Sequence, residues 1–188
     1  MNSILDSLSL YCPICGSGLL TSGHCKNRDC YYLLPDTNSI DISFKSQGIA
    51  KALSNICNYK FSFDNVECQS MESFIQSLRT PDVNLQEEIC SMTGLFSYNI
   101  RTMLPDWRNS QKVYWRGIEI DRHSDEYSTL LYNAYYELYS QSAIFKYALD
   151  LTKDKGYSLI HTIGCHDRTL TLLSPNEFIG HLNHLRGC

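Results

Sequence analysis

One carboxylate, Glu72, stands where it could take part in chemistry. Ser70 precedes it with a hydroxyl suited to capping a helix, and apolar residues follow at i, i+3, i+4 and i+7, the pattern of one buried helical face (Met71, Phe74, Ile75 and Leu78). Glu72 therefore falls in the first helical turn, where the helix dipole favours its charged form. Such a carboxylate could activate water or stabilise a cation, although a solvated glutamate on an exposed face fits the same pattern.

The segment before this helix has the pattern of a β-hairpin. Phe61 and Phe63 alternate with polar residues, Asp64-Asn65 is a turn signal, and residues 66–68 can return as a second strand. Within the helix, Gln76 lies one turn after Glu72, on the same face. We therefore expect a hairpin to lead directly into the helix that carries Glu72.

Four of the nine cysteines lie close together near the N-terminus, at Cys12, Cys15, Cys25 and Cys30. The first pair encloses a Cys-Pro-Ile-Cys-Gly turn that is typical of a zinc knuckle, and the second pair follows after a short loop. Four thiolates would complete a closed tetrahedral site, so the expected zinc (Zn) is structural. His24 is an alternative to Cys25 as a ligand. We predict a zinc-ribbon module over residues 1–37.

Composition limits the possible partners and locations of the chain. The chain has 188 residues and a formal net charge of −4, so any nucleic-acid binding must come from a local patch or a specific site. No basic start with a long apolar run is present, and no apolar stretch approaches the length of a membrane span. We therefore expect an intracellular, cytoplasmic protein that does not engage a membrane.

The second predicted domain, residues 38–188, has an α+β pattern that is mainly helical with a small antiparallel sheet. Strand patterns lie near residues 40–44 and 156–163. Helical patterns lie at residues 96–103, 107–120, 125–140, 143–151 and 176–186. The tyrosines of the 125–140 segment suit packing in the core better than a base-stacking platform.

Over roughly residues 40–188 the chain resembles the NADAR (YbiA-like) family. That family has a Ser-Asn-Phe element, then a hairpin, then a helix that opens Ser-x-Glu-x-x-x-Gln-x-x-Lys. Here Ser54-Asn55-Ile56 stands for the first element, and Arg79 replaces the lysine. The likeness continues at four later places in the same order: Leu104-Pro105-Asp106-Trp107, Tyr139-Ser140-Gln141-Ser142, Asp167, and Asn176 with Arg186.

The resemblance implies a hydrolase that cleaves the bond between a ribose C1 and a nitrogen. Such cleavage passes through an oxocarbenium-like sugar, which needs a carboxylate near C1 and an activated water. Glu72 and Asp167 are the implied catalytic residues. The implied substrate-binding residues are Lys45, Ser54, Asn55, Gln76, Trp107, Asn176 and Arg186. Trp107 could stack on a heterocyclic ring or anchor the core, and both alternatives stay open.

The chain departs from the family pattern around the implied pocket. Thr162 stands where many members have an acidic residue, Leu170-Thr171 replaces an aromatic residue and a glycine, and Gly180 is shifted by one position. A second metal site at His161, Cys165 and His166 is less favoured than a satisfied histidine in a turn, because no fourth ligand has suitable spacing.

Three functions are consistent with the sequence. The first is removal of ADP-ribose from guanine bases of DNA or RNA, which the N-terminal cysteine module favours. The second is cleavage of a riboflavin-pathway intermediate. The third is a binding module for ADP-ribose or nucleic acid that has lost turnover.

Overall fold

The computed structural model describes residues 17, 18, 26, 27 and 39–187. The four predicted zinc ligands, Cys12, Cys15, Cys25 and Cys30, lie outside the described residues. The zinc ribbon and the boundary at residue 37 therefore stay predictions.

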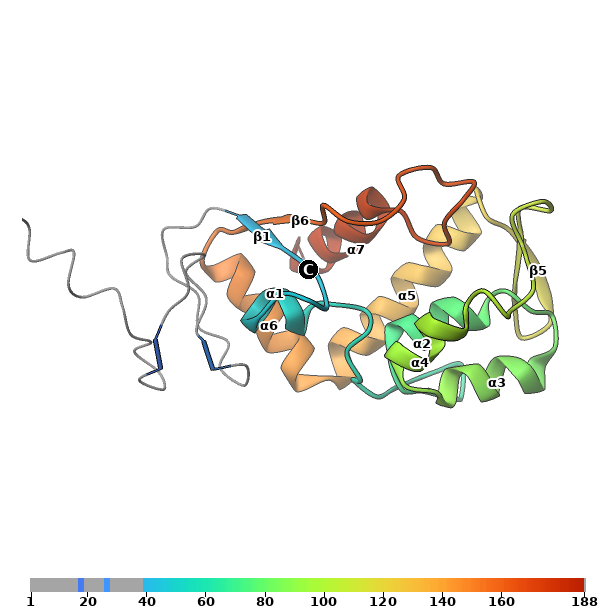
Figure 1. Cartoon of the computed structure of the whole chain (residues 1–188), viewed down its shortest axis with the longest axis horizontal. Coiled ribbons are helices and arrows are strands. Elements are labelled where there is room, and N and C mark those ends of the chain that lie inside the picture. Colours follow the sequence, from blue (N-terminus) through green and yellow to red (C-terminus); the bar gives the residue numbers. More distant parts are fainter. Residues whose placement is uncertain (1–16, 19–25, 28–38, 188) are drawn as a thin grey trace, which may run out of the picture.

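Between residues 39 and 187 the chain forms seven helices and six short strands (Figure 1). The helices are α1 (Gly48–Ala52), α2 (Met71–Ser77), α3 (Val83–Ser91), α4 (Gly94–Ile100), α5 (Asp125–Gln141), α6 (Ala143–Asp154) and α7 (Pro175–Gly187). The strands are β1 (Ser39–Asp41), β2 (Phe61–Phe63), β3 (Val66–Cys68), β4 (Lys112–Trp115), β5 (Ile118–Asp121) and β6 (Ser158–Ile160). The mainly helical α+β fold is thereby confirmed.

The strands form three separate pairs. β2–β3 and β4–β5 are antiparallel hairpins that form two separate sheets, where the sequence predicted a single small antiparallel sheet. β1 and β6 instead pair in parallel, with Ile40 opposite Leu159. This pair joins the start of the domain to the segment after α6, and a parallel partner so distant in sequence leaves no local turn signal to predict it.

Helix α5 crosses the domain between α7 on one side and the α2–α4 group on the other (Figure 1). Its buried face, which includes Tyr127, Leu131, Tyr135 and Leu138, packs into the common core. The tyrosines that face inward thus serve as core residues, as predicted. No helix in the described part of the chain is long and apolar enough to cross a bilayer.

The hairpin and helix that carry Glu72 form as predicted. Asp64 and Asn65 have φ of 48° and 63°, the left-handed values that a tight hairpin turn needs. The Ser70 hydroxyl accepts a hydrogen bond from the Ser73 amide at 3.0 Å and caps α2. The four apolar residues of the predicted helical face, Met71, Phe74, Ile75 and Leu78, are all buried.

The helix predicted over residues 107–120 is wrong, because this segment forms the β4–β5 hairpin. Val113 and Trp115 are buried on one face of β4, and Arg116 and Gly117 make the turn with φ of 51° and 79°. β-Branched and aromatic residues on both sides of a Gly turn favour a hairpin over a helix. The Trp115 indole Nε1 donates to Asp64 Oδ2 at 2.7 Å, so one hairpin braces the other.

A close backbone contact fixes where α4 begins. A Cβ atom on Gly94 would come within 2.4 Å of the Ile56 carbonyl oxygen, so only glycine fits there. The Gly94 amide donates to Asn58 Oδ1 at 2.9 Å. These contacts hold α4 against the loop that contains Ser54 and Asn55.

Candidate functional site

Glu72 lies where two adjoining pockets meet. The pockets have volumes of about 390 and 380 Å³, and both are lined by Asn55, Glu72, Tyr98, His161 and Phe178. The first, which we name the arginine pocket, also contains Gln76, Arg79, Arg101 and residues 170–173. The second, named the apolar pocket, also contains Ile42, Phe44, Ile56, Leu95 and Ile163, with Lys45 and Ser54. Together they form the Glu72 cleft, and each has the size of a small-molecule site.

Local contacts hold the Glu72 side chain and backbone in place. The Glu72 amide donates to the Asn55 carbonyl oxygen at 2.9 Å, which ties the start of α2 to the preceding loop. The Gln76 Nε2 donates to Glu72 Oε1 at 2.9 Å, across one turn of the helix. The carboxylate therefore has a fixed orientation, and Oε2 has no partner among the described residues.

Burial controls the ionisation of Glu72. It raises the pKa of the carboxyl group above the usual value, while Gln76, Arg101 and Arg79 act in the opposite direction. The sequence had suggested that the helix dipole would favour the charged form, and the net direction is the reverse. A carboxyl group with a raised pKa can hold and release a proton nearer to neutral pH, as acid–base catalysis requires.

The two arginines of the cleft lack carboxylate partners. Arg79 Nη1 donates to the Arg101 carbonyl oxygen at 3.0 Å, and the Arg101 guanidinium lies 3.8 Å from the centre of the Tyr98 ring. Within residues 39–187 neither arginine forms an ion pair. Arg79 Nε and Gln76 Oε1 are buried with no hydrogen-bond partner in the same part of the chain. The arginine pocket thus holds positive charge that an anionic ligand could neutralise.

A hydrogen bond from Tyr135 orients the Asn55 side chain in the cleft. The Tyr135 hydroxyl donates to Asn55 Oδ1 at 2.8 Å, and the Tyr135 ring stacks against the rings of Phe178 and His181 at centroid distances of 6.2 and 5.4 Å. Because Tyr135 occupies the amide oxygen, the Asn55 amino group is left to donate towards a ligand.

The cleft brings together five of the predicted site residues, Lys45, Ser54, Asn55, Glu72 and Gln76. Four others, Trp107, Asp167, Asn176 and Arg186, line neither pocket. Trp107 is buried in the core, and Asn176 is exposed. The Arg186 guanidinium donates to the Tyr157 carbonyl oxygen at 2.7 Å and so holds the segment before β6.

Asp167, the predicted second acid, lies in the exposed loop between β6 and α7. Its Oδ1 accepts hydrogen bonds from the Thr169 hydroxyl at 2.7 Å and the Thr169 amide at 2.9 Å. These bonds lower the pKa of Asp167. The carboxylate thereby shapes the loop, while Leu170 to Leu173 of the same loop form the pocket wall.

Three residues that line the Glu72 cleft were not predicted from the sequence: Tyr98, Arg101 and Phe178. No local pattern could have found them, because α4 and α7 reach the cleft only through tertiary packing. His161 contacts both pockets, and its Nδ1 lies 2.5 Å from the Ile42 carbonyl oxygen. It is therefore a satisfied histidine, as predicted, and no group of metal ligands occurs in the described part of the chain.

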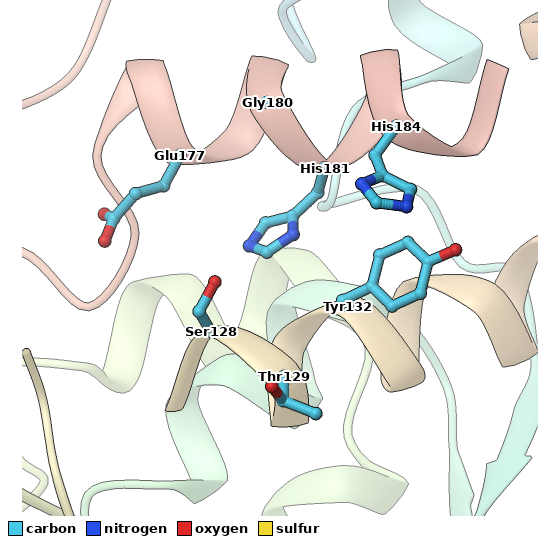
Figure 2. Close-up of a pocket in the computed structure, with 7 residues that line it drawn as sticks. All are labelled: Ser128, Thr129, Tyr132, Glu177, Gly180, His181 and His184. Atoms are coloured by element: carbon cyan, nitrogen blue, oxygen red, sulfur yellow. The ribbon is translucent and has the colours of Figure 1, made fainter. Parts of the chain in front are cut away.

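A separate pocket of about 400 Å³ lies between α5 and α7 (Figure 2). Ser128, Thr129 and Tyr132 line it from α5, and Glu177, Gly180, His181 and His184 line it from α7. Its carboxylate, Glu177, is already paired, because it accepts two hydrogen bonds from the buried Arg122 at 2.9 and 2.7 Å. We name it the Glu177 pocket.

The chain resembles known proteins both in fold and in sequence. The NMR structure of the Escherichia coli protein YbiA is similar, with a TM-score of 0.55 and 13% sequence identity, over 85% of this chain and 89% of YbiA. This likeness supports the YbiA-like fold. A protein of Enterobacteria phage T4, described as an uncharacterized 17.1 kDa protein in the Gp30-rIII intergenic region, is 30% identical over 136 residues. That match covers 72% of this chain and 88% of the phage protein.

The family described as bacteriophage protein GP30.3 matches residues 47–187, which include every residue from the start of α1 to the end of α7. This span contains Glu72 and most of the cleft. The chain therefore belongs to the bacteriophage protein GP30.3 family.

Proposed function

We propose that this protein is an N-glycosidase that removes ADP-ribose from guanine bases of nucleic acid. The observation that carries the proposal is the position of Glu72, a carboxylate with a raised pKa at the junction of a cationic and an apolar pocket. The YbiA-like fold supports the same reaction class, because the NADAR family that the sequence resembles contains N-glycosidases.

The geometry suits hydrolysis at a ribose C1. As the bond between C1 and the base nitrogen breaks, the sugar gains oxocarbenium character, which the Glu72 carboxylate stabilises by its charge. Water then forms the new bond to C1 and passes a proton to Glu72. The leaving nitrogen keeps the bonding electrons, and the proton that Glu72 took from water is passed to it through solvent, so charge and atoms balance and the Glu72 carboxylate is restored. Gln76 holds the carboxylate in orientation through its bond to Oε1.

The reaction is tested with a single-stranded DNA oligonucleotide that carries one ADP-ribosylated guanine. We expect the wild-type protein to release ADP-ribose, and Glu72→Gln to lower the rate by about 100-fold or more while binding stays within a few-fold. Glu126→Gln, in the exposed first turn of α5, is the matched control and should retain full activity.

The alternatives predict different outcomes of the same assay. Binding of the oligonucleotide without release would identify a binding module. Release from a riboflavin-pathway intermediate but not from the oligonucleotide would identify a small-molecule enzyme. Either result contradicts the proposed substrate.

Structural zinc and nucleic-acid delivery by the N-terminal module belong to the same proposal. Metal analysis should find about one zinc per chain. Lys26 and Arg28 lie between the last two predicted ligands, Cys25 and Cys30. Neutralising both should weaken oligonucleotide binding and reduce the slope of log K against log salt concentration by roughly one to two. Turnover of a mononucleotide substrate should not change. Equal loss with both substrates would indicate an effect on stability.

A further inference from the structure

The two halves of the Glu72 cleft differ in chemistry. The arginine pocket contains two guanidinium groups, and Glu72 is its single lining carboxylate. The apolar pocket is walled by aliphatic and aromatic side chains from four separate segments: Ile42, Phe44, Ile56, Leu95 and Ile163. A ligand that spans Glu72 must therefore present different groups on its two sides.

The arginine pocket suits a sugar phosphate. Arg101 is held over Tyr98, and Arg79 is held by the Arg101 carbonyl oxygen, so both cations keep fixed positions. Neither is neutralised by an ion pair within residues 39–187. A guanidinium without a carboxylate partner favours phosphate, because its planar donors match phosphate oxygens.

The apolar pocket suits a flat heterocycle. Leu95 and Ile163 are 46% and 52% exposed, and they lie in α4 and in the loop after β6. Apolar walls with a few polar groups are typical of pockets that bury a ring system. Asn55 lines both pockets, and its amino group, left open by the Tyr135 bond, supplies a donor to this one.

We propose that the substrate lies across Glu72 in one direction, with its sugar phosphate in the arginine pocket and its base in the apolar pocket. The scissile bond between C1 and nitrogen then falls beside the Glu72 carboxylate, where the two pockets meet. This inference rests on the proposed function and adds the polarity of the bound substrate. It also makes Arg79 and Arg101 binding residues for the phosphate and Leu95 and Ile163 binding residues for the base.

The test measures the binding of each half of the substrate by isothermal titration calorimetry. Ribose 5-phosphate and ADP-ribose represent the sugar phosphate, and guanosine represents the base. Arg101→Gln and Arg79→Gln should each weaken both phosphate ligands by roughly tenfold and leave guanosine within about twofold. Leu95→Ser and Ile163→Ser should weaken guanosine by roughly fivefold and leave ribose 5-phosphate within about twofold.

Matched controls separate binding from stability. Arg116→Gln removes an arginine that pairs with Glu87 in an exposed ion pair outside the cleft, and Ile144→Ser removes an apolar side chain that is 46% exposed, like Leu95. Neither control should change the affinity of any of the three ligands. Unfolding temperatures of all variants identify any that lose structure.

The pattern of results distinguishes this inference from the proposed function. Guanosine should bind to protein saturated with ADP-ribose, since the two ligands occupy different pockets. Displacement of guanosine by ADP-ribose would overturn the assigned direction, and so would loss of guanosine binding in the arginine variants with phosphate binding intact. Wild-type protein that binds neither phosphate ligand would overturn the proposed function together with this inference.

Discussion

Two glutamates in this fold begin from similar local settings and end in opposite ones. Glu72 and Glu177 both lie in the first turn of a helix, after the serines Ser70 and Ser174, and each lines a pocket of about 390 to 400 Å³. Burial raises the pKa of Glu72. Burial acts in the same direction on Glu177, but the Arg122 guanidinium and Ser174 outweigh it and lower that pKa to about 2.

The difference lies in how fully each carboxylate is paired. Glu177 receives two hydrogen bonds from Arg122, one from Arg168, and two from the Ser174 amide and hydroxyl. Glu72 receives one side-chain hydrogen bond, from Gln76. A fully paired carboxylate stabilises the fold, whereas a partly buried and incompletely paired one is available for a ligand. Pocket volume alone does not separate the two.

The largest expected effect is on stability at Glu177. Glu177→Gln leaves the fully buried Arg122 without its counter-charge, so the free energy of unfolding should fall by about 3–5 kcal/mol. Urea denaturation measures the change, with Glu126→Gln as the control that should stay within about 0.5 kcal/mol of wild type. A loss below about 1 kcal/mol would mean that the two glutamates do not differ as described.

Acid should lower the free energy of unfolding in two steps, the first through His181 and the second through Glu177. Burial lowers the pKa of His181 to about 4, although nearby Glu177 opposes it. The unfolded chain therefore binds more protons below pH about 6.5, and the free energy of unfolding should fall by roughly 3 kcal/mol between that pH and about 4. The carboxylate of Glu177, with its pKa of about 2, adds a second loss below pH about 4.5.

Unfolding measured as a function of pH separates the two steps. His181→Gln should abolish the loss between pH about 6.5 and 4 and keep the loss at lower pH. His123→Gln, at an exposed histidine, should keep both. An unchanged profile in His181→Gln would show that another group is responsible.

A smaller effect of opposite sign is expected for the stability of Glu72→Gln. A carboxyl group with a raised pKa binds more protons when folded, so its charged form destabilises the fold at neutral pH. Glutamine removes that charge and can still accept the Gln76 hydrogen bond. The free energy of unfolding should stay the same or rise by up to about 1 kcal/mol while turnover collapses. Loss of stability would place Glu72 with Glu177 as a structural residue.

The smallest effect is expected at Asp167. Its exposed carboxylate contacts Thr169 and lines neither half of the cleft, so Asp167→Asn should change turnover by less than about threefold. Steady-state kinetics with the ADP-ribosylated oligonucleotide measure this. A loss of about 100-fold, with Glu72→Gln near normal, would reverse the catalytic assignment.

Much of the local structure around Glu72 could be predicted from the sequence. The turn at Asp64-Asn65, the Ser70 cap and the apolar face of α2 depend on residues a few positions apart, and all three appear as expected. The helix expected over residues 107–120 was wrong, because a helical count of apolar residues overlooked the turn at Arg116 and Gly117.

Which residues share the cleft depended on contacts between distant segments. In the loop after β6, residues 170–173 line the arginine pocket and Asp167 does not. Arg101, which follows the last residue of α4, lines the same pocket. Local patterns predicted a helix at both α2 and α7, because capping and amphipathicity act within a few turns of chain, and each helix has a glutamate in its first turn. Only the tertiary structure decided which was neutralised, because Arg122 reaches Glu177 from β5's end, far along the chain, while no arginine pairs with Glu72 within residues 39–187.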